Sequence, residues 1–345
     1  MIDKNSFKYR KTIFVSSIRG EHIRLRNSNI IIEDKDGKII GQESCYSIMI
    51  VFVFGDISIT TAMIKAAKKY GFTFAFMTSM FRTECMIGNI REGQTVLRQR
   101  QYEYTGDEFA NWIVRNKVRN QYSLLERLVI QHPEYPNILP KLKVRIEELE
   151  NAVFEPDTLR GLEGTFAGRY FRTIFYNEDW KGRKPRERKD FINASLDIGY
   201  TMLFNFVETI IRYYGFDLYK GFYHTDYWIR KSLVCDLIEP FRPIIDDVVA
   251  TCIRQRKIVP GDFYNKNGNL ELERKKWPEY QIYFADAVVA RKEDIFDFVR
   301  KFYRSFANGK PIDEFPNKIK NIFLARHHGI GKIYLIFRPL FSFQF

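Results

Sequence analysis

The hydrophobic period of this chain changes near residue 100, and no other feature limits its fold as strongly. The part before the change reads as strands and turns: a β-branched run at 12–16, the turn signal Asp36-Gly37 and an unbroken apolar run at 48–54. Only 60–70 has helical spacing there. We therefore expect a small β-sandwich-like N-terminal domain with one docked helix over residues 1–100.

Helical spacing dominates the second part, from Thr105 to about residue 305. Val114, Val118 and Leu125 recur on one face of its first long helix. Asn267-Gly268 is a hairpin signal within this part and indicates a small insertion. The chain is therefore predicted to be an α+β protein, in which a larger all-α domain over 101–345 follows the β domain.

Length and composition limit the class of protein. A chain of 345 residues is long enough for two hydrophobic cores, and its 45% of hydrophobic residues supplies the material to fill them. The four cysteines form no C-x-x-C pair, the start of the chain has no signal-peptide pattern, and the longest apolar run is too short to cross a membrane. We expect a soluble cytoplasmic protein that does not bind a membrane.

The charge balance favours a polyanionic partner. Lys and Arg number 55 against 42 Asp and Glu, which gives a formal net charge of +13. Each phosphate that a cation neutralises releases condensed counterions, so this surplus suits nucleic acid, although a basic protein that binds none would have the same composition. Six cations gather in one loop and are predicted to track phosphates, unless that loop is only a solvated surface: Lys181, Arg183, Lys184, Arg186, Arg188 and Lys189.

Glu163 is the first candidate for chemistry. It lies on the same helical stripe as Leu159, Phe166 and Tyr170, and a carboxylate on an apolar stripe is costly unless it is paired or binds a cation. Glycines at three nearby positions weaken that helix, which makes sense if a ligand must approach the backbone. A glutamate at the edge of the stripe that reaches solvent would give the same pattern.

His224, Asp236 and Glu239 are the other candidates. His224 lies in a turn-rich segment between two helical patterns, and Asp236 and Glu239 stand three residues apart on one helical face. Two neighbouring carboxylates repel unless a cation or proton lies between them. Taken singly, the histidine is compatible with a surface role and the acids with a solvated face. Together with Glu163 they form an oxygen-rich set that suits Mg²⁺ or Mn²⁺ better than zinc.

The segments that carry these residues resemble, in this order, motifs of the CRISPR-associated adaptation integrases, the Cas-one family. The matching stretches are Leu159-Arg160-Gly161-Leu162-Glu163-Gly164 with Tyr170-Phe171, Asp190-Phe191-Ile192-Asn193-Ala194-Ser195-Leu196 with Gly199-Tyr200, the Gly-x-Asp-x-Tyr-x-Gly-Phe-x-His stretch at 215–224, and the Asp-Leu-x-Glu-x-Phe-Arg-Pro stretch at 236–243. Lys117, Asn120 and Gln121 are similar to an earlier helix of that family. Two departures are small: Phe191 replaces a common proline, and Asp197 stands where a small residue is usual.

The resemblance implies a role for each candidate. Glu163, His224 and Glu239 would bind one Mg²⁺ or Mn²⁺ ion, with Asp236 close by as a supporting carboxylate. Tyr170 would support the site together with Asn193. The cations expected to contact DNA are Arg183, Lys184, Arg186, Arg188, Lys189 and Arg242.

The implied function is spacer acquisition. A 3′-hydroxyl of a short prespacer duplex would attack a phosphodiester in the leader-adjacent repeat of a CRISPR array. The family forms homodimers through the β domain, and two dimers flank a dimer of the small Cas-two protein. Two other functions stay open: a free-standing metal nuclease that acts on branched DNA or RNA, and a catalytically silent DNA-binding scaffold of the same adaptation complex.

Overall fold

The structure is a computed structural model that describes residues 10–17, 20–77, 83–89, 93–185, 187–224 and 228–317. The chain divides into two compact units at residue 90, so that the described part of the first unit ends at 89 and that of the second starts at 93. The helix α3, Thr95–Glu103, thus belongs to the second unit, whereas the sequence pattern placed the boundary at 100.

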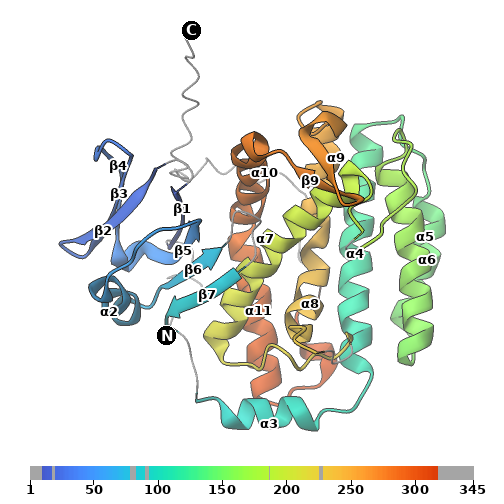
Figure 1. The fold of residues 1–345 in the computed structure, drawn as a ribbon. Helices are drawn as coiled ribbons and strands as arrows, with labels where there is room; N and C mark the ends of the chain where they lie inside the picture. The colour runs from blue at the N-terminus through green and yellow to red at the C-terminus, as the bar shows by residue number, and fades with distance from the viewer. Residues whose placement is uncertain are drawn as a thin grey trace. The chain divides into compact units, whose positions relative to one another are not determined.

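The first unit consists of two sheets and one described helix (Figure 1). The larger sheet has the order β1-β5-β6-β7; β1, β5 and β6 run parallel, and β7 is antiparallel to β6. The smaller sheet, β2-β3-β4, is antiparallel. The bounds are β1 Lys11–Ser16, β2 His22–Arg26, β3 Asn29–Glu33, β4 Ile39–Ser44, β5 Ile48–Phe54, α2 Thr61–Tyr70, β6 Thr73–Met77 and β7 Thr83–Gly88.

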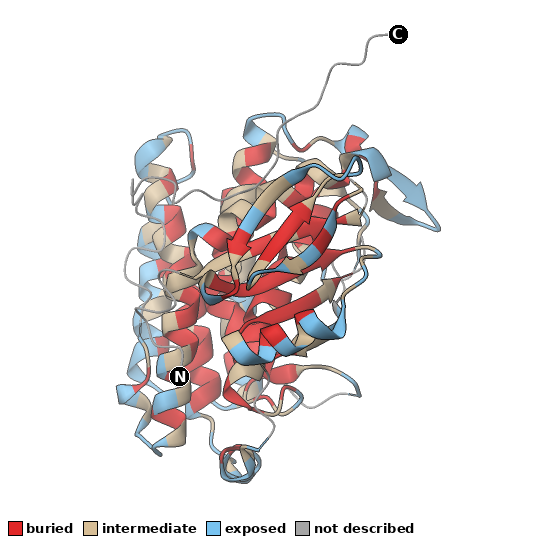
Figure 2. Ribbon diagram, turned by 90° about the vertical axis from the view of Figure 1, so that its left-hand side faces the viewer, coloured by how far each residue is buried: buried red, intermediate tan, exposed pale blue. Residues whose placement is uncertain are grey.

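One hydrophobic core joins the layers of this unit. All seven residues of β5 are buried, as the unbroken apolar run predicted, and β6 is buried at four of its five residues; Figure 2 draws buried residues in red. Val15 of β1, Ile30 of β3, Val51 of β5 and Met63 of α2 belong to the same buried cluster. A sandwich-like pair of sheets with a docked helix, followed by a mainly helical unit, confirms the predicted α+β class.

The second unit is a helical bundle with one small hairpin. Its helices are α3, α4 Glu108–Gln131, α5 Leu139–Asn151, α6 Pro156–Ile174, α7 Phe191–Tyr214, α8 Ser232–Ile238, η3 Glu239–Phe241, α9 Arg242–Arg254, α10 Trp277–Ala290 and α11 Lys292–Ala307. The strands β8 Phe263–Lys266 and β9 Asn269–Leu272 form the hairpin that Asn267-Gly268 predicted, because both turn residues have positive φ, 53° and 79°. No helix in the described part of the chain is long and apolar enough to cross a membrane.

Helix α7 is the centre of this unit. It is buried over most of its length, and Asp190 caps its first turn by accepting a hydrogen bond from Asn193 N at 2.7 Å. At Gly199 the helix lies so close to α9 and α10 that a Cβ would fall 2.4 Å from Ile245 and 2.8 Å from Phe284. The motif glycine therefore has a packing role. It brings α7 and α9, which both carry residues of the candidate site, into contact.

Candidate active site

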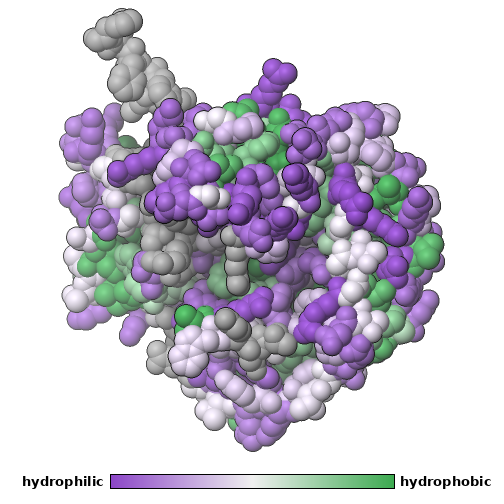
Figure 3. Space-filling view, turned by 45° about the vertical axis from the view of Figure 1, so that its right-hand side comes forward, coloured by the Kyte–Doolittle hydropathy of each residue, from purple (hydrophilic) through white to green (hydrophobic). Residues whose placement is uncertain are grey.

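A cleft of about 1430 Å³ opens in the second unit. Its walls come from α4, α6, α7, α8, η3, the loop between α6 and α7, and the β8–β9 hairpin. Glu163, His224 and Glu239 all line it, so residues from three separate segments meet as the sequence motifs predicted. Eight basic side chains line the same cleft against four carboxylates, which makes its surface positive. The face of the molecule drawn in Figure 3 is mostly hydrophilic, and its hydrophobic patches are small and separated.

Two of the carboxylates share one lysine. Lys117 Nζ on α4 lies 2.6 Å from Glu163 Oε1 on α6 and 2.6 Å from Glu239 Oε2 on η3. The two oxygens can therefore be no further apart than twice that distance. Helix α4 also fixes η3 directly, because the side-chain amide of Asn120 donates a hydrogen bond of 2.6 Å to the Pro240 carbonyl. The sequence motifs gave no role in the site to this lysine.

Asp236 holds the loop that presents His224. The aspartate is fully buried, and its carboxylate accepts hydrogen bonds from three successive backbone amides, those of Phe222, Tyr223 and His224, at 2.6, 3.1 and 2.9 Å. It also lies 2.7 Å from His224 Nδ1. The acceptor oxygens fix the ring with its proton on Nδ1, which leaves the Nε2 lone pair free, 3.8 Å from Glu239 Oε1. The structure thus places Asp236 behind the histidine and not on the cleft wall.

Glu239 is a buried anion surrounded by cations. Its side chain is 3% exposed, and Arg242 Nη2 lies 3.0 Å from its Oε1. Burial by itself would raise the pKa of Glu239, but Arg242 and Lys117 offset this and lower the pKa to about 2. The guanidinium of Arg242 also lies over the ring of Tyr200, 4.8 Å from its centroid. Arg242, which we expected to contact DNA, is therefore held by Glu239 and by an aromatic face.

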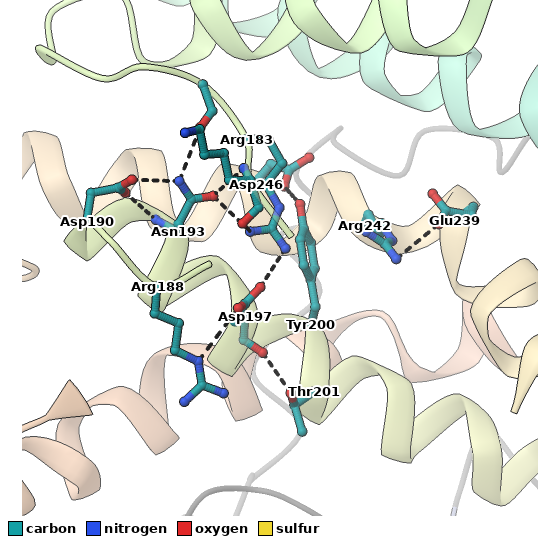
Figure 4. A network of polar contacts seen from close by, with 12 residues as sticks. Arg183, Arg188, Asp190, Asn193, Asp197, Tyr200, Thr201, Glu239, Arg242 and Asp246 are labelled. Atoms are coloured by element: carbon teal, nitrogen blue, oxygen red, sulfur yellow. Dashed lines mark hydrogen bonds and ion pairs between the residues drawn. The ribbon is translucent and has the colours of Figure 1, made fainter. Parts of the chain in front are cut away.

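A buried aspartate joins α6, α7 and α9 beneath the cleft. Asp246 accepts a hydrogen bond of 2.7 Å from the hydroxyl of Tyr170. It accepts a second one from the hydroxyl of Tyr200 (Figure 4). Tyr170 is thus a buried residue that links α6 to α9 through Asp246, and it does not line the cleft. Burial raises the pKa of Asp246 to about 6, although the two tyrosine hydroxyls, Arg242 and Lys117 all act in the opposite direction.

This raised pKa predicts a pH-dependent stability. The folded state holds the Asp246 proton up to a pH of about 6, whereas an unfolded aspartate loses it near 3.9, so its stabilising contribution is complete below about pH 4 and is lost as the pH rises through 6. Asp246→Asn removes this titration. We expect the melting temperature of the wild type, relative to that of the variant, to fall between about pH 4 and 7. A constant difference over that range would contradict the assignment.

Two residues of α7, Asn193 and Asp197, hold the basic loop that precedes this helix. Arg183 forms an ion pair of 2.5 Å with Asp197, and Arg188 approaches the same carboxylate at 3.6 Å (Figure 4). Asn193 is fully buried; its side-chain oxygen accepts from Arg183 Nη1 at 2.9 Å and from Lys184 N at 3.0 Å. Asp197, the departure from the family pattern, therefore neutralises part of the loop that we expected to bind DNA.

Other cations in the cleft keep their charge uncompensated. Among the described residues, Arg172, Lys181 and Arg230 line the cleft and form no ion pair with a carboxylate. Lys184 and Lys189 are exposed and lie outside the cleft lining, and Arg186 lies outside the described residues. The sequence placed Lys181 in the basic run but gave no signal for Arg172 or Arg230, because each is a single cation on a separate element.

The donor set of the site fits a divalent cation. No three His, Cys, Asp or Glu side chains in the described part of the chain are arranged to hold an ion as they stand. Instead, the Lys117 ammonium already stands as a cation between Glu163 and Glu239. His224 Nε2 lies 3.8 Å from the other oxygen of Glu239. Two carboxylates and one imidazole nitrogen are ligands that suit Mg²⁺ or Mn²⁺.

Fold and cleft together define an α+β protein whose helical unit presents a carboxylate and histidine cluster in a positively charged cleft. The family model for CRISPR associated protein Cas1 matches residues 15–280, and the chain belongs to this family. The predicted resemblance is thereby confirmed.

One relative is similar in sequence, and two solved structures are similar in fold. CRISPR-associated endonuclease Cas1 4 of Methanospirillum hungatei is 28% identical over 260 residues, which cover 73% of each chain. A casposase bound to its integration product has a TM-score of 0.69 at 19% identity, covering 90% of this chain and 95% of the casposase. A chain of a partial Cas6-RT-Cas1–Cas2 complex has a TM-score of 0.70 at 18% identity, covering 90% and 99%.

Proposed function

We propose that this chain is a spacer-acquisition integrase that joins the 3′-hydroxyl ends of short DNA duplexes into the repeat of a CRISPR array. The observation that carries the proposal is the meeting of Glu163, His224 and Glu239 in a positive cleft of about 1430 Å³. Sites for small molecules enclose about 300–1,000 Å³, so this cleft suits a segment of a charged polymer. Relatives named endonucleases and a casposase with its integration product support the same chemistry.

Each residue of the cluster has a separate task in the proposed reaction. Glu163, Glu239 and the Nε2 atom of His224 would hold Mg²⁺ or Mn²⁺, and Asp236 fixes the histidine ring. The ion would polarise the phosphodiester and lower the pKa of the attacking hydroxyl. The new bond joins the 3′-oxygen to phosphorus, and the bond from phosphorus to the repeat strand's 3′-oxygen breaks. The attacking hydroxyl loses one proton and the leaving oxygen gains one, so the step needs no external energy source.

The glycine-rich face of α6 supports a close approach by DNA. Gly164 and Gly168 line the cleft, and a Cβ at Gly164 would meet no atom within 4 Å. Protein packing therefore does not require this glycine. A smooth helix face beside Glu163 lets a nucleotide backbone reach the carboxylate.

Assembly with partners is part of the proposal. The Cas1–Cas2 complex among the structural neighbours supports a small Cas2 dimer as the partner, and the β unit is the proposed surface for a Cas1 homodimer. Short prespacer duplexes and the leader and repeat of the array would be the DNA substrates.

Strand transfer in vitro tests the function. The protein, alone and with Cas2, is mixed with short duplexes, Mn²⁺ or Mg²⁺, and a plasmid that carries a leader and repeat. Covalent joining that needs the metal is the expected result. Metal-dependent nicking without joining would favour the nuclease, and binding without chemistry would favour the silent scaffold.

The uncompensated cations should carry DNA affinity. We expect Lys181→Gln to reduce the slope of log affinity against log salt by about 0.9, the value for one lost phosphate contact on duplex DNA. Arg172→Gln and Arg230→Gln should act alike. Arg183→Gln should instead lower the melting temperature. Asp197 would lose its ion pair with Arg183, and the side-chain oxygen of Asn193 would lose the hydrogen bond from Arg183 Nη1.

Fluorescence anisotropy with a labelled duplex at several salt concentrations measures these slopes. Lys301→Gln is the control: this exposed lysine of α11 pairs with Asp297 of its own helix and does not line the cleft. An unchanged slope in all three cleft variants would assign DNA binding to another surface.

A further inference from the structure

Lys117 lies between two of the proposed metal ligands, so its position affects how a metal ion could bind. Its ammonium lies at an equal distance of 2.6 Å from one oxygen of Glu163 and one of Glu239. The lysine side chain is only 11% exposed, and that of Glu239 only 3%. The ammonium is thus a buried counter-ion, and it occupies the space between the two carboxylates that we propose as metal ligands.

A divalent ion and this ammonium cannot share the position. Mg²⁺ binds oxygen at about 2.0–2.1 Å, so an ion held by the same two oxygens, Glu163 Oε1 and Glu239 Oε2, would lie almost where Nζ lies now. Two cations at such a separation repel strongly in a partly buried site. Metal binding to these two oxygens therefore requires the ammonium to leave, and the flexible four-carbon stem of a lysine permits this.

The structure offers the displaced ammonium a new environment. Lys117 lines the cleft, so its stem already borders the space that DNA would fill. Gln121 lines the same cleft one turn further along α4, and its Oε1 is buried with no hydrogen-bond partner among the described residues. A hydrogen-bond acceptor left alone at this depth is costly, which favours a state in which a donor reaches it.

We propose that Lys117 is an exchangeable internal cation: it holds Glu163 and Glu239 together before the metal binds, and the metal displaces it into the cleft toward Gln121 and a DNA phosphate. This inference rests on the proposed function. Because the freed ammonium adds a positive charge to the DNA surface, the metal strengthens DNA binding. By reciprocity, DNA strengthens metal binding by the same factor. Lys117 is in this sense a positioning residue that couples the two ligands.

Direct titration with Mn²⁺, followed by electron paramagnetic resonance of the free ion, tests this without any enzyme turnover. The proteins are the wild type, Lys117→Met, Lys117→Gln and Glu163→Gln. Each is titrated alone and with a short duplex whose 3′ ends are dideoxy-terminated. We expect DNA to tighten Mn²⁺ binding by the wild type about tenfold, within the usual range of coupling between two sites. Lys117→Met and Lys117→Gln should bind Mn²⁺ about tenfold more tightly without DNA and show little further gain with it.

The outcomes separate this inference from the function beneath it. Mn²⁺ binding that needs Glu163 but is equal or weaker in both Lys117 variants would overturn the exchange. The same holds if DNA leaves the wild-type affinity unchanged, a result that depends on no variant. Equal Mn²⁺ titrations of the wild type and Glu163→Gln would instead overturn the proposed metal site. Lys181→Met controls for the loss of one positive charge in the cleft, and its Mn²⁺ affinity without DNA should change far less.

Discussion

Glu163→Gln is expected to lower the rate of strand joining by about a thousandfold or more, while DNA affinity measured without the metal changes little. Glutamine has nearly the same shape as glutamate but no charge, so the cleft keeps its form and loses one of its two carboxylates on the proposed metal. Removing a single group that stabilises transition-state charge commonly costs 10²–10³ in rate, and loss of a metal ligand removes a larger share of that stabilisation.

The neighbours of Glu163 explain why the fold should survive this change. The side chain is 18% exposed and its partner Lys117 keeps a second contact, with Glu239 at 2.6 Å. The melting temperature should therefore stay close to that of the wild type. Asp157→Asn on the same helix is the matched control, because this exposed acid pairs with Arg160 alone in the described part of the chain and lies outside the cleft lining. Joining by Glu163→Gln at the rate of the control would remove Glu163 from the mechanism.

The sequence predicted the fold class and the family because these depend on local pattern. The unbroken apolar run of β5, the Asn267-Gly268 turn and the helical periods each act within a few residues, and the structure contains the elements they predicted. The ordered motifs also named Glu163, His224 and Glu239, which the fold brings to one cleft. Their catalytic roles remain the proposal made above.

What the sequence could not predict are pairings between distant elements. Lys117 meets its two glutamates only after α4, α6 and η3 pack together, and no periodicity links those positions. Because burying a charge without a partner is costly, charged residues from distant parts of the chain pair with one another in the folded protein. For the same reason Arg183 could be counted as a DNA contact, although Asp197 on the next helix neutralises it in the folded protein.

The loop that carries His224 depends on one aspartate, and Asp236→Asn is the second change from which we expect a large effect. The carboxylate accepts hydrogen bonds from three backbone amides and lies 2.7 Å from His224 Nδ1. An asparagine has one acceptor oxygen and turns an NH₂ group toward these donors, so at least one buried amide loses its partner. Hydrogen bonds to a charged group contribute about 1.5–3 kcal/mol each, and we expect destabilisation of that order.

Activity should fall together with stability in this variant. Partners behind a metal ligand commonly contribute 10–100-fold to affinity or rate, so strand joining by Asp236→Asn should fall by about a hundredfold. His224→Ala provides the comparison: it removes the ring but leaves the three amide contacts, so joining should stop while the melting temperature changes little.

A second buried aspartate provides a control. It distinguishes an effect on the His224 loop from the general effect of removing a buried charge. Asp262 is 3% exposed and accepts hydrogen bonds from Val259 N and the Tyr280 hydroxyl, both at 3.1 Å, but it does not line the cleft. Asp262→Asn should therefore lower the melting temperature and keep joining near the wild-type rate. If Asp236→Asn behaved in the same way, the histidine would keep its position without this carboxylate. Loss of joining in Asp236→Asn alone would show that the buried aspartate acts through the geometry of His224.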